Sequence, residues 1–147
     1  MIDRSALRFG NLDNFVEISA AVEQDPSLQS DGDARLSIVV QSHGFSGRNH
    51  CWTARAALWA FAEQLAQLDR SLKGAAKLES ISPGELDLHV RTVSPLGHMA
   101  VVGSAARRLR DDYESYLHSV AFGFEIDATQ LSAALSNSWL SEYVAWG

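Results

Sequence analysis

A single segment with helical periodicity separates two regions with strand periodicity. Between residues 54 and 72, apolar side chains recur at spacings of three and four: Ala54, Leu58, Phe61, Leu65, Leu68 and Leu72. This spacing predicts one long helix with a continuous apolar face. We expect Thr53 to cap its start and Gly74 to end it in the left-handed conformation. Strand and helix do not alternate along the chain, so the order of elements favours an antiparallel sheet over a parallel one.

Two strands that form a hairpin are predicted ahead of the helix. Apolar and polar residues alternate over residues 16–22 and again over residues 35–41, and residues 23–33 between them contain an Asp-Gly turn signal. Alternation with a period of two is typical of strands that turn one face toward the core. Residues 44–49 interrupt the alternation and predict a break before the helix.

Strand patterns return after the helix and continue for about fifty residues, far more than one strand can span. The expected strands contain Leu78, then residues 86–90, then residues 99–102, and finally residues 119–126. Pro83-Gly84 and the type I turn signal at residues 94–97 separate the first three. Residues 107–112, rich in arginine and aspartate, predict a charged connection. Asp127 and Gln130 form a capping-box signature for a short second helix with Leu131, Ala134 and Leu135 inward.

These elements predict an α+β fold: an antiparallel meander sheet of about six strands, covered on one face by one long helix, plus a short C-terminal helix. At 147 residues the chain is expected to form a single domain over residues 1–147. One helix covers only one face of such a sheet. The other face is left to water or to a partner.

Strand parity predicts which side chains occupy that uncovered face. If Leu78 and Leu88 both point toward the helix, Glu79 lies opposite Asp87 and Lys77 lies opposite His89. Two carboxylates directly across a strand pair repel each other unless a cation joins them. The face is interpreted either as a solvated surface with balanced charges or as a binding patch. The residues of that patch are Lys77, Glu79, Asp87, His89, Arg91 and His98.

Catalytic chemistry has weaker support in the sequence. His98 follows the turn at residues 94–97 and is the histidine that would serve a small hydrolase or isomerase, together with Glu79 or Asp87. A flat sheet face does not supply the dry, concave setting that shifts a carboxyl pKa. The loop at residues 44–47 matches neither a nucleophile elbow nor a phosphate-binding fingerprint. We therefore expect no catalytic residue and no cofactor.

Metal, nucleic-acid and membrane roles are also not expected. The five histidines and the single Cys51 do not stand at metal-ligand spacings, and Cys51 is expected in the core. The formal net charge of −6 disfavours nucleic acid. The first residues lack the apolar core of a signal peptide and no stretch is long and apolar enough to span a bilayer, which predicts a cytoplasmic protein.

Large aromatic residues close the chain at Trp139, Tyr143 and Trp146. They are too apolar for a solvated tail. Two interpretations stay open: the segment folds back onto the domain, or it forms an interface, with a homodimer as the simplest result.

Several apolar motifs resemble those of the WapI-like immunity proteins and related bacterial families. The resemblance covers about residues 36–140 and consists of Trp52, Leu58-xx-Phe61-xxx-Leu65-xx-Leu68, Gly74-x-Ala76-x-Leu78, Pro83-Gly84-Glu85-Leu86, Gly97-His98 and Phe122-Gly123-Phe124-x-Ile126-Asp127. It implies a small bacterial α+β protein without established catalytic residues, encoded in some genomes beside contact-dependent toxins.

A binding domain is therefore the leading hypothesis, in which a toxin-like protein partner contacts the open sheet face or the C-terminal aromatic residues. An acidic inhibitor suits a basic toxin nuclease, because opposite fields speed encounter and select the partner. The alternatives are the small enzyme that uses His98 and a homo-oligomeric structural protein joined through its terminal aromatics.

Overall fold

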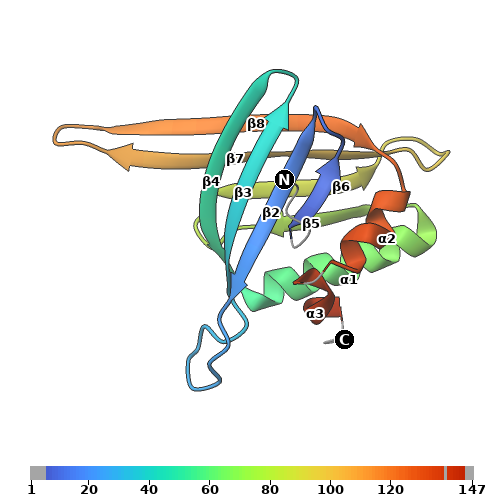
Figure 1. The fold of residues 1–147 in the computed structure, drawn as a ribbon, viewed down its shortest axis with the longest axis horizontal. Helices are drawn as coiled ribbons and strands as arrows, with labels where there is room; N and C mark the ends of the chain where they lie inside the picture. The colour runs from blue at the N-terminus through green and yellow to red at the C-terminus, as the bar shows by residue number, and fades with distance from the viewer. Residues whose placement is uncertain (1–5, 138, 145–147) are drawn as a thin grey trace.

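The computed structural model describes residues 6–137 and 139–144. In this part of the chain it has eight strands and three helices, which fall into an α+β arrangement (Figure 1). In chain order they are β1 (Leu7–Gly10), β2 (Phe15–Val22), β3 (Ala34–Ser42), β4 (Phe45–Thr53), α1 (Arg55–Ser71), β5 (Ala75–Glu79), β6 (Leu86–Thr92), β7 (Met99–Arg110), β8 (Ser115–Ile126), α2 (Thr129–Leu135) and α3 (Leu140–Val144).

The strands form two antiparallel sheets, not one. Strands β1 to β4 make the N-terminal sheet and strands β5 to β8 make the C-terminal sheet, each in sequence order. The prediction of a single meander of about six strands is therefore wrong. Four strands precede the helix, enough for a sheet of their own, and the helix connects the two sheets along the chain.

Sequence patterning missed the short strand β1, at residues 7–10, and also the longer strand β4, at residues 45–53. The core-facing positions of β4 carry Gly47, Asn49, Cys51 and Thr53, small or polar residues that hide the usual alternation. It pairs with β3 through a tight turn at His43 and Gly44, both of which have positive φ. The interruption at residues 44–49 is therefore a turn followed by a strand.

The core lies between the two sheets, which cross steeply in Figure 1. Strands β3 and β4 contact β8, and β4 also contacts β7. The two sheets approach closely at Gly47, where a Cβ atom would lie 2.9 Å from Cγ1 of Val120. The buried side chains are Leu7, Phe9, Val16, Ile18, Leu36, Ile38 and Val40 from the N-terminal sheet and Leu78, Leu86, Leu88, Val90, Val101 and Phe122 from the C-terminal sheet. The N-terminal sheet, together with the helix, therefore covers one face of the C-terminal sheet.

The predicted hairpin of β2 and β3 is confirmed, with Ile18 opposite Ile38 in the register of the pair.

The long helix is also confirmed, because α1 buries Leu58, Phe61, Leu65 and Leu68 against β5 and the two shorter helices. Its ends differ from expectation. Thr53 belongs to β4, and the Arg55 amide instead donates to Oδ1 of Asp33 at 2.8 Å.

The C-terminal end of α1 departs from expectation as well. Leu72 adopts the left-handed conformation and donates its amide to the Leu68 carbonyl, so it ends the helix two residues before Gly74. The predicted second helix is present as α2. Oδ1 of Asp127 accepts from the Thr129 amide, but the Gln130 side chain bonds to the backbone of Gly10 instead of closing a capping box.

The last hairpin extends as a two-stranded ribbon. Strand β6 begins at Leu86, opposite Ala105, so residues 106–110 of β7 pair only with residues 115–119 of β8. We call residues 106–119 the arm, which projects from the body at the left of Figure 1. The predicted charged connection at residues 107–112 is therefore mostly strand, and the turn lies at residues 111–114, where the Asp111 amide bonds to the Glu114 carbonyl.

Candidate functional site

The face of the C-terminal sheet that points away from the N-terminal sheet, here called the outer face, carries most of the predicted patch. The register is the predicted one: Lys77 pairs with His89 and Glu79 pairs with Asp87. Leu78 and Leu88, between them in sequence, are fully buried, so these polar residues point outward. Arg91 follows on the same side, opposite Ala75. The structure therefore brings five of the six predicted patch residues onto one face.

Within this patch, the side chain that meets a carboxylate is His89. Nε2 of His89 lies 2.8 Å from Oδ1 of Asp87, two residues away on the same strand and on the same face. The side chains are 29% and 45% exposed. Both groups therefore remain accessible to a partner.

A shallow hollow adjoins the patch at the start of β6. It has a volume of about 400 Å³, and its lining includes Glu79, Ser80, Ile81, Asp87 and Ser104. Asp87 and Ser104 are direct partners in the β6–β7 register. The two carboxylates that the sequence placed opposite each other therefore border a concave part of the outer face.

His98 lies elsewhere. It is exposed in the turn before β7, where its Nδ1 lies 2.9 Å from Oγ of Ser94. Ser104, which opposes Asp87, is six positions further along the chain, a separation of about 20 Å for extended strand. The structure does not bring His98 together with Glu79 or Asp87.

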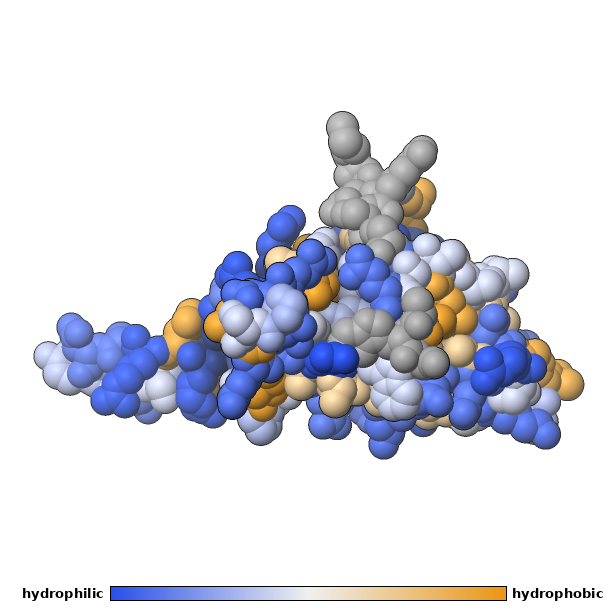
Figure 2. Space-filling view, turned by 90° about the horizontal axis from the view of Figure 1, so that it is seen from below, coloured by the Kyte–Doolittle hydropathy of each residue, from blue (hydrophilic) through white to orange (hydrophobic). Residues whose placement is uncertain are grey.

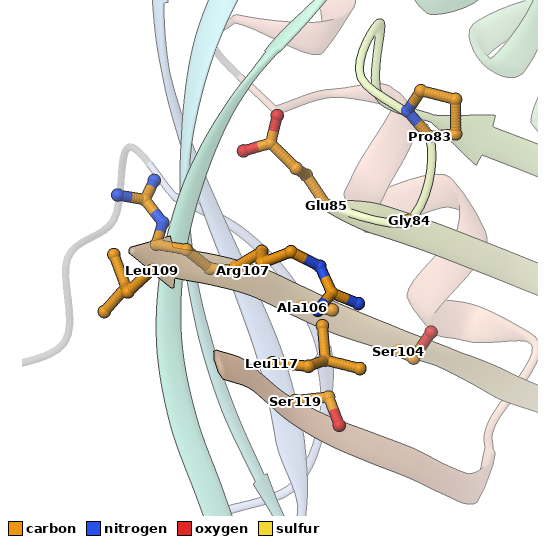
Figure 3. Close-up of a pocket in the computed structure, with 10 residues that line it drawn as sticks. Pro83, Gly84, Glu85, Ser104, Ala106, Arg107, Leu109, Leu117 and Ser119 are labelled. Carbon is orange, nitrogen blue, oxygen red and sulfur yellow. The ribbon is translucent and has the colours of Figure 1, made fainter. Parts of the chain in front are cut away.

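A larger hollow of about 780 Å³ lies where the arm leaves the body (Figure 3). Figure 3 shows the turn at residues 83–85 on one side and the arm residues Leu109 and Leu117 on the other. It shares Pro83, Gly84 and Ser104 with the smaller hollow, so the two are neighbours on the outer face. Sequence reasoning missed this site because it read the arm as a loop.

Asn49 attaches the arm to the N-terminal sheet. Its Nδ2 donates to the carbonyls of Glu85 and Ala106, both at 2.9 Å, and its Oδ1 accepts from Nε of Arg107 at 2.9 Å. Arg107 also donates to the His50 carbonyl. One asparagine side chain of β4 thus binds both β7 and the turn before β6 at the base of the arm.

The rest of the arm is exposed and of mixed polarity. Leu109, Tyr116 and Leu117 are each about half exposed, and Tyr113 at the tip is 94% exposed. Figure 2 shows the projecting arm covered mostly by hydrophilic residues, with hydrophobic residues closer to the body. The arm therefore presents single apolar side chains to solvent among charged ones.

The tip of the arm is ordered by its own turn. Oδ1 of Asp111 accepts from the amides of Glu114 and Tyr113, both at 2.9 Å. The bond from the Glu114 amide, with that from Tyr113, lowers the pKa of the Asp111 carboxyl. Asp111 is therefore used inside the turn, and among the described residues it forms no ion pair with the arginines of the arm.

The aromatic residues near the C-terminus fold back onto the domain. Trp139 and Tyr143 are 6% and 2% exposed. Nε1 of Trp139 donates to the Ile18 carbonyl at 3.1 Å, and the Tyr143 hydroxyl donates to the Gly32 carbonyl at 2.6 Å. These two side chains therefore belong to the core and offer no exposed surface for the predicted interface. Trp146 lies outside the described residues.

Cys51 is buried beside Thr53, and burial raises the pKa of its thiol. No three His, Cys, Asp or Glu side chains of residues 6–137 and 139–144 cluster at distances suited to a metal ion. Within the same residues, no helix has the length and hydropathy to cross a bilayer.

Comparison with protein-family models, with curated proteins and with solved structures finds no match to this chain.

Proposed function

We propose that the chain is a binding protein of the immunity or inhibitor kind, which contacts a toxin-like protein partner through the outer face of its C-terminal sheet. The observation that carries this proposal is the continuity of three features on one side of the molecule. The polar patch, the two adjoining hollows and the projecting arm follow one another along β6, β7 and β8.

The accessible polar groups of this surface suit recognition of a protein. Its Asp87–His89 contact is partly exposed, its hollows are shallow, and its large apolar side chains lie singly on the arm. Protein interfaces combine such apolar anchors with a polar rim. The net charge of −6 favours encounter with a basic partner, and the resemblance of residues 36–140 to the WapI-like immunity proteins suggests a partner of that class.

Affinity capture from the organism that encodes the chain tests this proposal. The tagged protein is compared with Asp87→Lys, which reverses a charge in the patch, and with Ser37→Lys, which adds a charge on the outward side of β3. We expect a protein that the native chain and Ser37→Lys retain and that Asp87→Lys loses. Equal recovery of every captured protein by Asp87→Lys refutes the assignment of this face.

The neighbouring reading frame gives a second, independent check. A large secreted toxin encoded beside this chain supports the inhibitor class of function. A metabolic operon argues against it.

A further inference from the structure

We propose that the free edge of β7 in the arm is a slot that takes an extended, acidic segment of the protein partner as an added strand. This inference rests on the proposed binding function and names the chemistry of the segment. The slot consists of the edge of residues 106–110 and the larger hollow beside it.

The backbone of the arm supplies the edge. The amide of Ala106 donates to the Glu85 carbonyl, so even-numbered residues of β7 turn their backbone groups toward the side of β6. The Asp111 amide bonds across the hairpin to Glu114, so odd-numbered residues turn toward β8. Beyond Ala106 the N–H and C=O groups of Arg108 and Arg110 therefore face the side that β6 has left.

Those backbone groups have no hydrogen-bond partner within the part of the chain that the structure describes. Strand β6 is not available to them, because Glu85 turns away through its bond with Ser82. A sheet edge with free donors and acceptors is the template for addition of another strand.

The hollow provides room for that strand. Its volume of about 780 Å³ lies between the turn at residues 83–84 and the arm, in line with the start of β6. A segment entering there prolongs β6 and pairs antiparallel to β7. Leu109 and Leu117, both about half exposed, offer apolar contacts on the two sides of the ribbon.

Charge selects the kind of segment. Arg108 and Arg110 are exposed on the outer side of the ribbon and form no ion pair among the described residues. Two residues apart, they stand on the same side of the strand. Acidic side chains at two alternate positions of an added strand lie directly opposite them, where opposite charges across strands are favourable.

The other end of the slot carries a carboxylate. Glu85 lines the hollow at the start of β6 together with Arg107, whose guanidinium already binds Asn49 and the His50 carbonyl. The carboxylate of Glu85 disfavours acidic side chains near the body, so an acidic pair fits best opposite Arg108 and Arg110. These charges favour one register of the added segment.

Synthetic peptides test the slot without knowledge of the natural partner. Three capped heptapeptides serve as probes: Thr-Val-Glu-Val-Glu-Val-Thr, the same sequence with lysine at both glutamates, and the glutamate peptide with N-methylated amides on alternate residues. Binding to the full chain is followed by the amide NMR shifts of the arm. We expect saturable shifts at Arg108 and Arg110 with the glutamate peptide, and much smaller shifts at Arg107 and Leu109, whose amides already bond to β8.

The two control peptides separate charge from backbone pairing. Loss of the shifts with the N-methylated peptide is expected, because it cannot complete the ladder. The double variant Arg108→Glu/Arg110→Glu is expected to reverse the preference toward the lysine peptide, while Arg35→Glu on the outward side of β3 leaves it unchanged. Equal binding of the glutamate and lysine peptides, or shifts confined to the turn at residues 111–114, overturns the slot.

Failure of the slot and failure of the proposed function give different results. If no peptide binds but capture of a partner still depends on Asp87, only the slot is lost. If the glutamate peptide binds as expected but Asp87→Lys captures every partner equally, the slot stands and the assignment of the patch is lost.

Discussion

Asn49 is the side chain on which the geometry of the arm most depends. It is the hydrogen-bond partner of two carbonyls and one guanidinium from two segments, the turn before β6 and strand β7. A sequence pattern does not reveal this role, because Asn49 occupies a core-facing position where alternation predicts an apolar residue. The structure gives the reason for a polar residue here. The pairing of β6 with β7 ends at the carbonyls of Glu85 and Ala106, and Asn49 supplies the hydrogen-bond donor that both carbonyls need.

Asn49→Ala is expected to lower the free energy of unfolding by about 1–3 kcal/mol, because two partly buried carbonyls lose their donor. Denaturant unfolding measures the change. Asn49→Asp retains the acceptor for Arg107 but places a carboxylate beside the carbonyls, so it is expected to destabilise as well. Ser37→Ala, on the outward side of β3, is the control and should stay within about 0.5 kcal/mol of the native chain. A change as small as the control's in both Asn49 variants contradicts this role.

Tyr143 makes the stability of the fold sensitive to alkaline pH. Burial raises its pKa from 10.0 to about 12, and the negative charges of Glu142 and Asp33 act in the same direction. The neutral hydroxyl donates to the Gly32 carbonyl. A raised pKa stabilises the fold fully below the unfolded pKa near 10, and this contribution is lost as the pH rises through about 12. The native chain should therefore lose more stability over this interval than Tyr143→Phe does.

Denaturant unfolding across that pH interval checks the prediction. Tyr113→Phe is the matched control, because its ring is 94% exposed and its loss should leave the alkaline slope unchanged. If the free energy of unfolding falls equally with rising pH in the native chain and in Tyr143→Phe, the fold does not raise the pKa of the Tyr143 hydroxyl and the prediction is wrong.

At the scale of elements, hydrophobic periodicity predicted helices and strands correctly, whereas the high charge of residues 107–112 wrongly predicted a loop. The apolar stripe of α1 and the alternation of β2, β3 and β6 predicted these elements together with the cross-strand pair of Glu79 and Asp87. Strand β4 and the arm were missed for one physical reason. Side chains of the arm pack against few neighbours, and those on the inner side of β4 pack closely against the other sheet or bond to its backbone. Charged, small or polar residues therefore occupy positions where a regular strand pattern has apolar ones.

The arm is an element whose removal should leave the fold intact. Replacing residues 108–117 by Asn-Gly joins Arg107 to His118 and retains the contacts of Asn49. A two-stranded ribbon stabilises a domain little, so we expect the free energy of unfolding to change by no more than about 1 kcal/mol. Capture of the partner, in contrast, should be lost. A shortened chain that unfolds, or that binds the partner as well as the native chain does, contradicts this role of the arm.

At the scale of the whole molecule, the difference between one sheet and two changes what covers the open face. The sequence placed α1 over the sheet, but the N-terminal sheet packs against β7 and β8 on the inner side of the C-terminal sheet, and α1 lies along β5. The periodicity of a segment does not predict which strands share a sheet, because the sheet arrangement depends on contacts between residues far apart in the sequence, such as Gly47 and Val120. The outer face nevertheless carries the five residues that parity placed on it.

The central claim is that this outer face and its arm meet a protein partner. Amide hydrogen exchange of the captured complex, compared with the free chain, tests it most directly. The account predicts slower exchange in β6 and in residues 106–119, with unchanged exchange on β2 and β3. Protection confined to the outward side of the N-terminal sheet, with the arm exchanging as in the free chain, would contradict it.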